Sequence, residues 1–205
     1  MSDFFKADAD AVEVVRREHC FRGFYRLDRL HLRHRQFSGA MGPLISRELF
    51  VRHDAVCVLP YDPLRDEVVL IEQFRVGALD KKASPWLLEL VAGLIDADEQ
   101  PEQVARREAI EEADLTLDRL WPITEYFPSP GGSDERVHLY LGRCDSGNAG
   151  GVHGLAEEGE DIRVHVLAYD DALRALKDGL IDNAASLIAL QWLALNRDDV
   201  RRVWC

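Results

Sequence analysis

The segment VAGLIDADEQPEQVARREAIEEADL, residues 91–115, decides the fold of this chain. Its second half has the composition of a helix, and Pro101 suits the first turn of that helix, which we expect to run to about residue 113. Glu108 and Glu112 stand four residues apart, a spacing at which like charges destabilise a helix by about 0.2–0.5 kcal/mol. A face of this kind is either solvated and ion-paired, as Arg107 and Glu111 could be, or it binds a cation. Hard divalent cations such as Mg²⁺ take oxygen ligands, so a carboxylate cluster is what such an ion would relieve.

Composition excludes several classes of function. The 205 residues carry 37 acidic and 25 basic side chains, which gives a formal net charge of -12 and argues against nucleic acid or an anionic membrane as a standing partner. The four cysteines form no CxxC pair, so a structural zinc or a disulfide framework is not expected. There is no apolar run of signal or membrane-spanning length. We therefore expect a cytoplasmic protein.

The order of predicted elements indicates an α/β protein. Residues 1–53 contain short alternating segments typical of half-buried strands and form a small β-rich N-terminal portion. Residues 54–205 combine strands with two or three helices, which predicts a mixed sheet flanked by helices. We expect strands at 55–61, 67–74, 86–91, 120–128, 136–143 and 162–168, and further helices at 170–177 and 184–196. Five glycines between 147 and 159 predict a mobile loop.

Fixed positions in the opening segment carry a family resemblance. Gly93 is followed after five residues by Glu99, and after seven more by REAIEE, residues 107–112. This pattern resembles the Nudix box, G-x5-E-x7-R-E-U-x-E-E-x-G-U, in which U is a bulky aliphatic residue. Ala109 is small where the box has bulk, and Asp114 replaces its last glycine. That glycine ends the helix in a left-handed conformation, which Asp adopts more readily than most residues.

The resemblance extends over residues 12–196 and is close to the bacterial ADP-ribose pyrophosphatase branch of the family. The matching segments are FRGFYRLD, SRELFVRHDAVCVLPYDPLRDEVVLIEQFR, PWLLELVAG, SPGGSDER, GLAEEGEDIRVHV and IDNAASLIALQWL. The resemblance implies a Nudix-type α/β/α sandwich with a mixed sheet over 54–205. It also implies that residues 1–53 are swapped between the subunits of a homodimer. The implied reaction is Mg²⁺-dependent hydrolysis of ADP-ribose to AMP and ribose 5-phosphate.

The resemblance also assigns roles to individual residues. The metal ligands would be the carbonyl of Ala92 and the carboxylates of Glu108, Glu112 and Glu160, holding two or three ions of Mg²⁺ or Mn²⁺. Glu158 would be the catalytic base, with Arg107 and Glu111 completing the catalytic set. The substrate would contact Arg52, Arg75, Leu94, Ser129 and Glu135. From the partner subunit it would contact Phe24, Tyr25, Arg47 and Glu48.

The residue types suit this chemistry on physical grounds. A bound metal neutralises the charge of a pyrophosphate and orients the attacking water, and a glutamate nearby can take the proton. Arg75 or Arg52 can hold phosphate oxygens, and Phe24 can stack on adenine. Each residue alone also has an ordinary structural explanation, and His153 or His165 could replace the glutamate as base.

The sequence is compatible with three functions: ADP-ribose hydrolysis, the same chemistry on another nucleoside diphosphate sugar or dinucleoside polyphosphate, and a non-catalytic ADP-ribose sensor. Intact Glu108, Glu111 and Glu112 argue against the sensor. The sequence leaves open the physiological substrate, the metal preference, the number of ions, the rates and the effect of Asp114.

Overall fold

The computed structural model describes residues 9–80 and 84–205, without the side chain of Glu158. It divides the chain into two compact units, each described by itself below. The N-terminal unit comprises Met1–Arg52 together with Phe127–Glu135, and the core unit comprises His53–Tyr126 together with Arg136–Cys205. The division at residue 52 lies next to the boundary that we expect from the sequence, whereas the grouping of Phe127–Glu135 with the N-terminal unit has no counterpart in that expectation.

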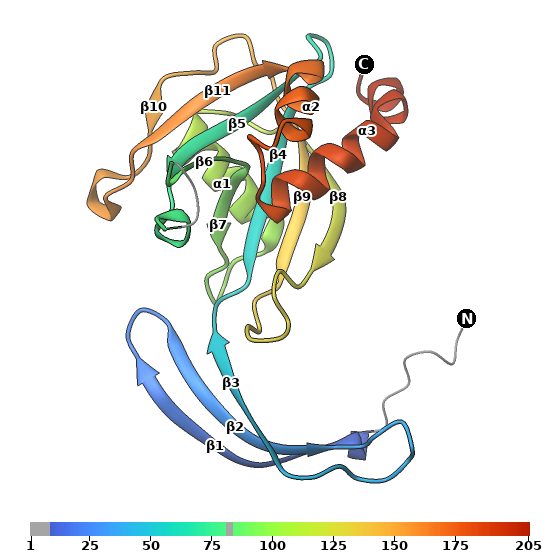
Figure 1. Cartoon of the computed structure of the whole chain (residues 1–205). Helices are drawn as coiled ribbons and strands as arrows, with labels where there is room; N and C mark the ends of the chain where they lie inside the picture. Colours follow the sequence, from blue (N-terminus) through green and yellow to red (C-terminus); the bar gives the residue numbers. More distant parts are fainter. Residues whose placement is uncertain (1–8, 81–83) are drawn as a thin grey trace. The chain divides into compact units, whose positions relative to one another are not determined.

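The N-terminal unit is a three-stranded antiparallel sheet of order β1-β2-β3 (Figure 1). Its elements are η1 (Ala9–Ala11), β1 (Val12–Arg22), β2 (Arg26–His34) and β3 (Ile45–Val51). Directly paired residues of an antiparallel sheet point to the same face. The pairs Val14↔Leu32 and Leu32↔Ile45 therefore place apolar side chains at one end of a face, and Arg17, Arg47 and Asp28 lie further along the same face.

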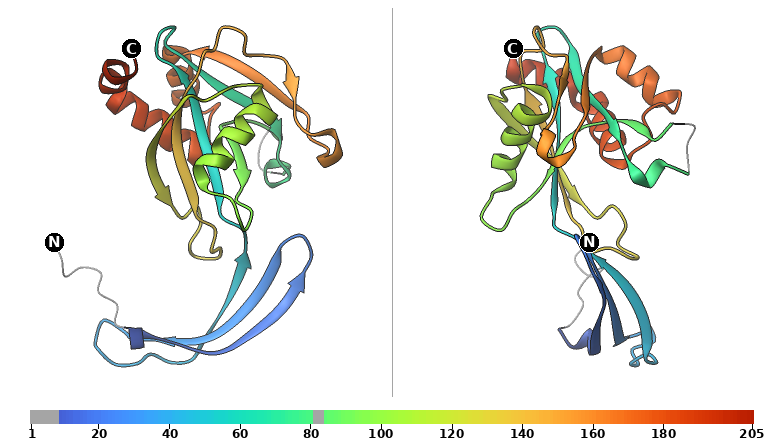
Figure 2. Two further views of the ribbon diagram at one scale, coloured as in Figure 1. Left: turned by 180° about the vertical axis from the view of Figure 1, so that it is seen from behind. Right: turned by 90° about the vertical axis from the view of Figure 1, so that its left-hand side faces the viewer.

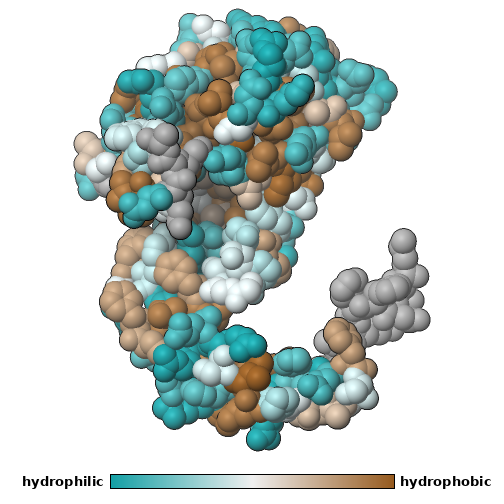
Figure 3. All heavy atoms as spheres, viewed as in Figure 1, coloured by the Kyte–Doolittle hydropathy of each residue, from teal (hydrophilic) through white to brown (hydrophobic). Residues whose placement is uncertain are grey.

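Asp28 is the fully buried residue on that face. Its carboxylate accepts hydrogen bonds from Arg17 Nε at 2.6 Å and Arg26 Nε at 3.1 Å, and His19 Nδ1 lies 2.7 Å away. Val12 and Val14, at the other end of this face, are 55% and 53% exposed. Figure 3 shows hydrophobic side chains interspersed with hydrophilic ones on the surface of this unit. The end of this face that carries Val12 and Val14 is therefore an apolar surface that its own unit does not cover.

The core unit is an eight-stranded mixed sheet between helices. The strand path is β10-β11-β5-β4-β9-β8, with β6 paired to β5 and β7 to β4, and β4 runs parallel to β9. Figure 2 shows α1 on one face of this sheet and α2 and α3 on the other. The strands are β4 (Ala55–Asp62), β5 (Glu67–Phe74), β6 (Trp86–Glu89), β7 (Val91–Leu94), β8 (Arg119–Tyr126), β9 (Val137–Arg143), β10 (Val152–His153) and β11 (Ile162–Ala168). The helices are α1 (Pro101–Ala113), α2 (Tyr169–Lys177) and α3 (Ala184–Trp204), with 3-10 turns η2 (Val76–Ala78) and η3 (Ala156–Glu158).

The β4–β5 hairpin opens soon after its turn. The two strands pair only at Tyr61↔Val68 and Asp62↔Glu67. Beyond that point β6 pairs with β5 and β7 pairs with β4. The single strand that we expect at 86–91 is therefore two strands, separated at Leu90. The reason is that successive halves of this apolar run bond to different neighbours.

Alternation along β5 divides the core between the two faces of the sheet. Val69 and Ile71 belong to the cluster that contains Val104 and Ala109 of α1, whereas Leu70 belongs to the cluster that contains buried residues of α3. Helix α3 is longer than the expected 184–196, because Val200 and Trp204 continue its buried stripe past a charged stretch. No helix in the described part of the chain is long and apolar enough to cross a membrane.

Candidate active site

Helix α1 begins and ends at defined residues. Gln100 and Gln103 cap its first turn: the side chain of each accepts a hydrogen bond from the backbone N–H of the other. Asp114 ends it in the left-handed region, with φ 51° and ψ 38°, and donates its backbone N–H to the carbonyl of Ile110 at 3.0 Å. The left-handed helix end expected at Asp114 is therefore present. Ala109 is fully buried against the sheet, so the small residue in the box is a packing residue of this interface.

Arg107 lies at the centre of the carboxylate face of α1. Its Nε and Nη2 donate to the two oxygens of Glu99 at 3.0 and 3.1 Å. Its Nη1 donates to Glu108 Oε1 at 2.8 Å and to Glu111 Oε2 at 3.0 Å. These contacts raise the pKa of Arg107 and lower the pKa of Glu99. One guanidinium thus balances three carboxylates, which explains how the helix tolerates their spacing.

Glu108 and Glu112 are the two carboxylates of α1 that burial affects most. Burial raises the pKa of Glu108 to about 7, against the opposing charge of Arg107. Burial likewise raises the pKa of Glu112 to about 8, against the hydrogen bond from the Ala92 N–H. The charge of Glu160 raises both values further. Two enclosed, mutually repelling carboxylates of this kind mark a candidate functional site.

Strand β7 brings the backbone of the box glycine against α1. Ala92 donates its N–H to Glu112 Oε2 at 2.9 Å. A Cβ built on Gly93 would stand 2.5 Å from Glu108 Cγ and still closer to its carboxylate. Gly93 therefore leaves the space that Glu108 fills. Leu94 follows on the same strand, opposite Ala55 of β4, and is partly exposed.

The glycine-rich segment contacts α1 and turns back on itself. The Gly154 N–H donates to the carbonyl of Glu111 at 3.3 Å. The Leu155 N–H donates to Glu160 Oε2 at 3.0 Å, and the Glu160 N–H donates to the carbonyl of Leu155 at 3.2 Å. The proposed base Glu158 ends η3, and its side chain lies outside the described part of the structure.

The two histidines that could compete as base lie differently. His165 is paired with Leu70 of β5, so it points to the α3 face, where its Nε2 lies 2.9 Å from Glu72 Oε2. His153 Nε2 lies 2.7 Å from the carbonyl of Gly150. His165 therefore faces away from α1 and is no candidate for chemistry at Glu108 and Glu112.

Arg75 lies just past the end of β5. Its Nε donates to Glu89 Oε2 at 2.7 Å, and its charge lowers the pKa of Glu112. Glu89 was not among the residues selected by motif or resemblance. The one signal for it is a charged residue inside the apolar run WLLELV, residues 86–91, which we interpret above only as a strand.

Several expected substrate contacts form a cluster within the N-terminal unit. The Phe24 and Tyr25 rings are 4.7 Å apart, and Tyr25 is 5.0 Å from Phe50. The Arg52 guanidinium lies over the Tyr25 ring at 4.9 Å, and its Nη1 pairs with Glu135 Oε2 at 3.2 Å. Phe24 itself is 83% exposed, which leaves its ring face open to a ligand.

The remaining expected contacts in this unit make local interactions. Arg47 Nη1 donates to the carbonyl of Ser46 at 2.8 Å. Glu48 Oε1 accepts from Arg29 Nη2 at 3.0 Å. Ser129 is exposed, and its carbonyl accepts the N–H groups of the two residues at 132 and 133.

The oxygen donors of the core unit fit a hard divalent cation. Within residues 9–80 and 84–205, no group of three or more His, Cys, Asp or Glu side chains is gathered closely enough to hold a metal ion by itself. Mg²⁺, however, usually takes one or two carboxylates and completes its shell with waters and substrate phosphates. Buried Glu108 and Glu112, which repel each other, match that requirement.

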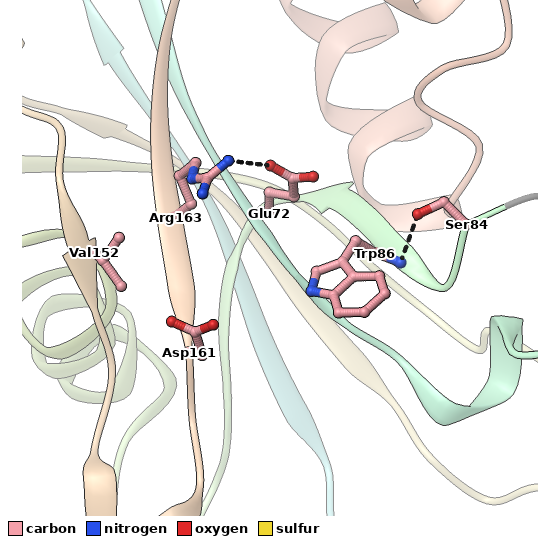
Figure 4. Close-up of a pocket in the computed structure, with 6 residues that line it drawn as sticks. All are labelled: Glu72, Ser84, Trp86, Val152, Asp161 and Arg163. Atoms are coloured by element: carbon pink, nitrogen blue, oxygen red, sulfur yellow. Dashed lines mark hydrogen bonds and ion pairs between the residues drawn. The ribbon is translucent and has the colours of Figure 1, made fainter.

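A separate cavity of about 360 Å³ lies on the other face of the sheet (Figure 4). It is lined by Glu72, Ser84, Trp86, Val152, Asp161 and Arg163. Arg163 is paired with Glu72 in the β11–β5 ladder, on the same face as His165. None of the residues selected from the sequence lines this cavity.

Comparison with known proteins identifies the family of this chain. The NUDIX domain model matches residues 51–190, so the chain belongs to the Nudix family of hydrolases. The ADP-ribose pyrophosphatase of Escherichia coli strain K12 is 51% identical over 94% of this chain and 92% of its own length. The corresponding Haemophilus influenzae protein is 41% identical over 100% of this chain and 95% of its own length.

Two further matches are more distant. A GDP-mannose pyrophosphatase of Cronobacter sakazakii is 35% identical over 73% of this chain and 78% of its own length. A solved structure described as an ADP compounds hydrolase superposes with a TM-score of 0.69 at 17% identity, covering 96% of this chain and 100% of the other. This superposition confirms the α/β fold with a mixed sheet. Dependence on a divalent metal accords with membership of this family.

Proposed function

We propose that this chain hydrolyses the pyrophosphate of ADP-ribose to AMP and ribose 5-phosphate. The observation that carries the proposal is the 51% identity to an ADP-ribose pyrophosphatase along 94% of the chain. The proposed substrate contacts come from both units, so similarity over nearly the whole length supports a shared substrate better than similarity in the box alone. The intact, partly buried glutamates of α1 favour an enzyme over a ligand sensor.

The proposed metal is Mg²⁺, with Mn²⁺ as a substitute, in two or three ions held by the Ala92 carbonyl, Glu108, Glu112 and Glu160. When bound, the metal supplies charge neutralisation at the phosphates and a more acidic water. Arg107 keeps Glu108 in place by its hydrogen bond, and Ala92 does the same for Glu112. Glu158 takes the proton of the attacking water.

The other side chains bind and orient the substrate. Arg75 and Arg52 hold phosphate oxygens through their guanidinium groups. Leu94, Ser129 and Glu135 also contact the substrate. The exposed ring of Phe24, with Tyr25, stacks on adenine. Arg47 and Glu48 complete this set from the N-terminal unit.

The proposed assembly is a homodimer in which each N-terminal unit serves the neighbouring site. Its support is the apolar end of the N-terminal sheet, where Val12 and Val14 are exposed and the unit does not cover them itself. Exposed apolar faces of this kind are typical of interfaces between subunits. We place the enzyme in the cytoplasm, in keeping with four cysteines that are all free thiols.

A second substrate class deserves direct comparison, because a GDP-mannose pyrophosphatase is 35% identical to the chain. The test is release of phosphate, coupled to alkaline phosphatase, from ADP-ribose, ADP-glucose, GDP-mannose and diadenosine polyphosphates. These compounds carry no terminal phosphate, so phosphate is released only after the pyrophosphate is cleaved. We expect the highest kcat/KM with ADP-ribose and expect chromatography to show AMP and ribose 5-phosphate. A higher kcat/KM with GDP-mannose would overturn the substrate, and no hydrolysis of any compound would overturn the enzyme.

A further inference from the structure

Three side chains lie together where β5 and β6 meet. Glu89 of β6 is paired with Ile71 of β5, and Gln73 is paired with Leu87. Side chains two residues apart on a strand share a face. Gln73 and Glu89 therefore lie on the face of Ile71, which packs in the core beneath α1. This is the face of the sheet that carries the candidate active site.

Glu89 is the acceptor that joins the other two side chains. Its Oε2 accepts from Arg75 Nε at 2.7 Å and from Gln73 Nε2 at 3.4 Å. The side chain of Glu89 is only 14% exposed, whereas that of Arg75 is 45% exposed. The carboxylate is thus fixed in a largely enclosed place, and the guanidinium that it holds reaches toward solvent.

The hydrogen bond to Glu89 uses Nε of Arg75 and not its two terminal nitrogens. Glu89 binds the Nε edge of the guanidinium. Neither terminal nitrogen of Arg75 has a hydrogen-bond partner among the side chains that the structure describes. The terminal nitrogens form the fork that matches two oxygens of a phosphate. A guanidinium held by Nε is oriented before the ligand arrives, so less side-chain freedom is lost on binding.

We propose that Glu89 is a positioning residue for Arg75: it orients the guanidinium so that both terminal nitrogens face the pyrophosphate of a nucleoside diphosphate substrate. Gln73 in turn orients Glu89. The inference deepens the proposed function and rests on it for the presence of a pyrophosphate in the site. It assigns Glu89 to substrate binding and not to the metal or to the proton.

The test is a double-mutant cycle of Glu89→Ala and Arg75→Ala with ADP-ribose as substrate. A charge-assisted hydrogen bond that orients a phosphate ligand corresponds to about 10- to 30-fold in affinity. We expect Glu89→Ala to raise KM by about that factor and to change kcat by less than about 3-fold. In the Arg75→Ala background the same change should raise KM by less than about 2-fold. Equal effects in both backgrounds would overturn the proposal.

Two further variants separate positioning from other roles. Glu89→Gln keeps an oxygen acceptor and should recover part of the lost affinity, and it replaces Glu89→Ala if the latter does not fold. The matched control is Glu72→Gln, the same change on the opposite face of β5, which should leave KM unchanged. The Mg²⁺ concentration for half-maximal rate should stay the same in all variants. A rise of that concentration in Glu89→Gln would make Glu89 a metal ligand and overturn the proposal.

Assays of the wild-type enzyme distinguish a wrong substrate from a wrong role of Glu89. If the wild type cleaves another nucleoside diphosphate in preference to ADP-ribose, the substrate is wrong, and the cycle is run with the preferred compound. If the wild type cleaves ADP-ribose and the cycle shows no coupling, the positioning role alone is wrong.

Discussion

Gly93 on β7 and Glu108 on α1 lie in such close contact that a side chain on the first would occupy the place of the second. A Cβ on Gly93 would stand 2.5 Å from Glu108 Cγ. Glu108 also receives the hydrogen bond from Arg107 Nη1, so it cannot move aside without losing that partner. The glycine that opens the box is thus required by the glutamate fifteen residues later.

Gly93→Ala tests this relationship. The added methyl group should displace Glu108, lower kcat at least about 10-fold and reduce the free energy of unfolding by about 1–3 kcal/mol. Steady-state kinetics and urea unfolding measure the two effects. Gly77→Ala is the matched control, since a Cβ at Gly77 would meet no atom within 4 Å. Normal activity of Gly93→Ala would show that Glu108 has room to rearrange.

Glu112→Gln should change turnover and stability in different ways. Removal of a charged ligand should lower turnover at least about 100-fold at saturating Mg²⁺. Because burial disfavours the charged form of Glu112, the neutral amide should leave the metal-free protein at least as stable at pH 7. Glu102→Gln, an exposed change in the first turn of the same helix, should alter neither property. Near-normal turnover of Glu112→Gln would remove Glu112 from the metal site.

Asp114→Gly should stabilise the protein by up to about 1 kcal/mol, because glycine adopts the left-handed conformation without steric cost. Asp66, with φ 60°, is the matched contrast. Its carboxylate bonds Arg197 and the hydroxyl of Tyr61, so Asp66→Gly should destabilise the protein despite the same backbone conformation. Thermal unfolding of both variants gives the comparison. A loss of stability in Asp114→Gly would reveal a contact of the exposed Asp114 side chain.

Asp62 predicts a pH dependence of stability. Burial alone would raise its pKa, but hydrogen bonds from Arg65 and from the N–H groups of Ser146 and Leu64 lower the pKa of Asp62 to about 2. A carboxyl group with a lowered pKa stabilises the fold above its unfolded value near 4 and loses this effect as pH falls toward 2. Asp62→Asn should therefore cost about 2 kcal/mol at pH 7, and the difference from wild type should shrink between pH 4 and pH 2. Exposed Asp198→Asn is the control, and a difference that is constant with pH would contradict the role of the charge.

Val14→Asp tests the proposed dimer. The variant places a charge at the apolar end of the N-terminal sheet, where Val14 is 53% exposed. Sedimentation at micromolar concentration should show a dimer for the wild type and a monomer with low activity for the variant. Phe37→Asp, at a fully exposed position between β2 and β3, should remain dimeric. A wild-type monomer with full activity would show that the N-terminal unit does not serve a second copy.

Local sequence signals predicted those elements whose bounds depend on residues close together in the sequence. Pro101 and the box predict α1, and the left-handed end at Asp114 follows from its place after the helix. The division of residues 86–94 into β6 and β7 could not be predicted, since Leu90 carries no turn signal and only the choice of neighbouring strand separates the two. The contact between Arg75 and Glu89 escaped prediction for the same reason, because it joins residues whose proximity depends on that pairing.

The opening of the β4–β5 hairpin has a consequence for insertions and deletions. Beyond the two positions at which β4 and β5 pair with each other, β5 pairs with β6 and β4 pairs with β7. Arg75 follows the end of β5, and Ala92, which holds Glu112, is paired to β4. A single residue added or removed at Leu90 would shift the register of β6 or β7 and turn the side chains of that strand to the opposite face, which would displace Glu89 or the backbone that contacts Glu108 and Glu112. The length of the chain at Leu90 is therefore constrained by residues on both sides of it, because Arg75 is held from β6 and Glu112 from β7.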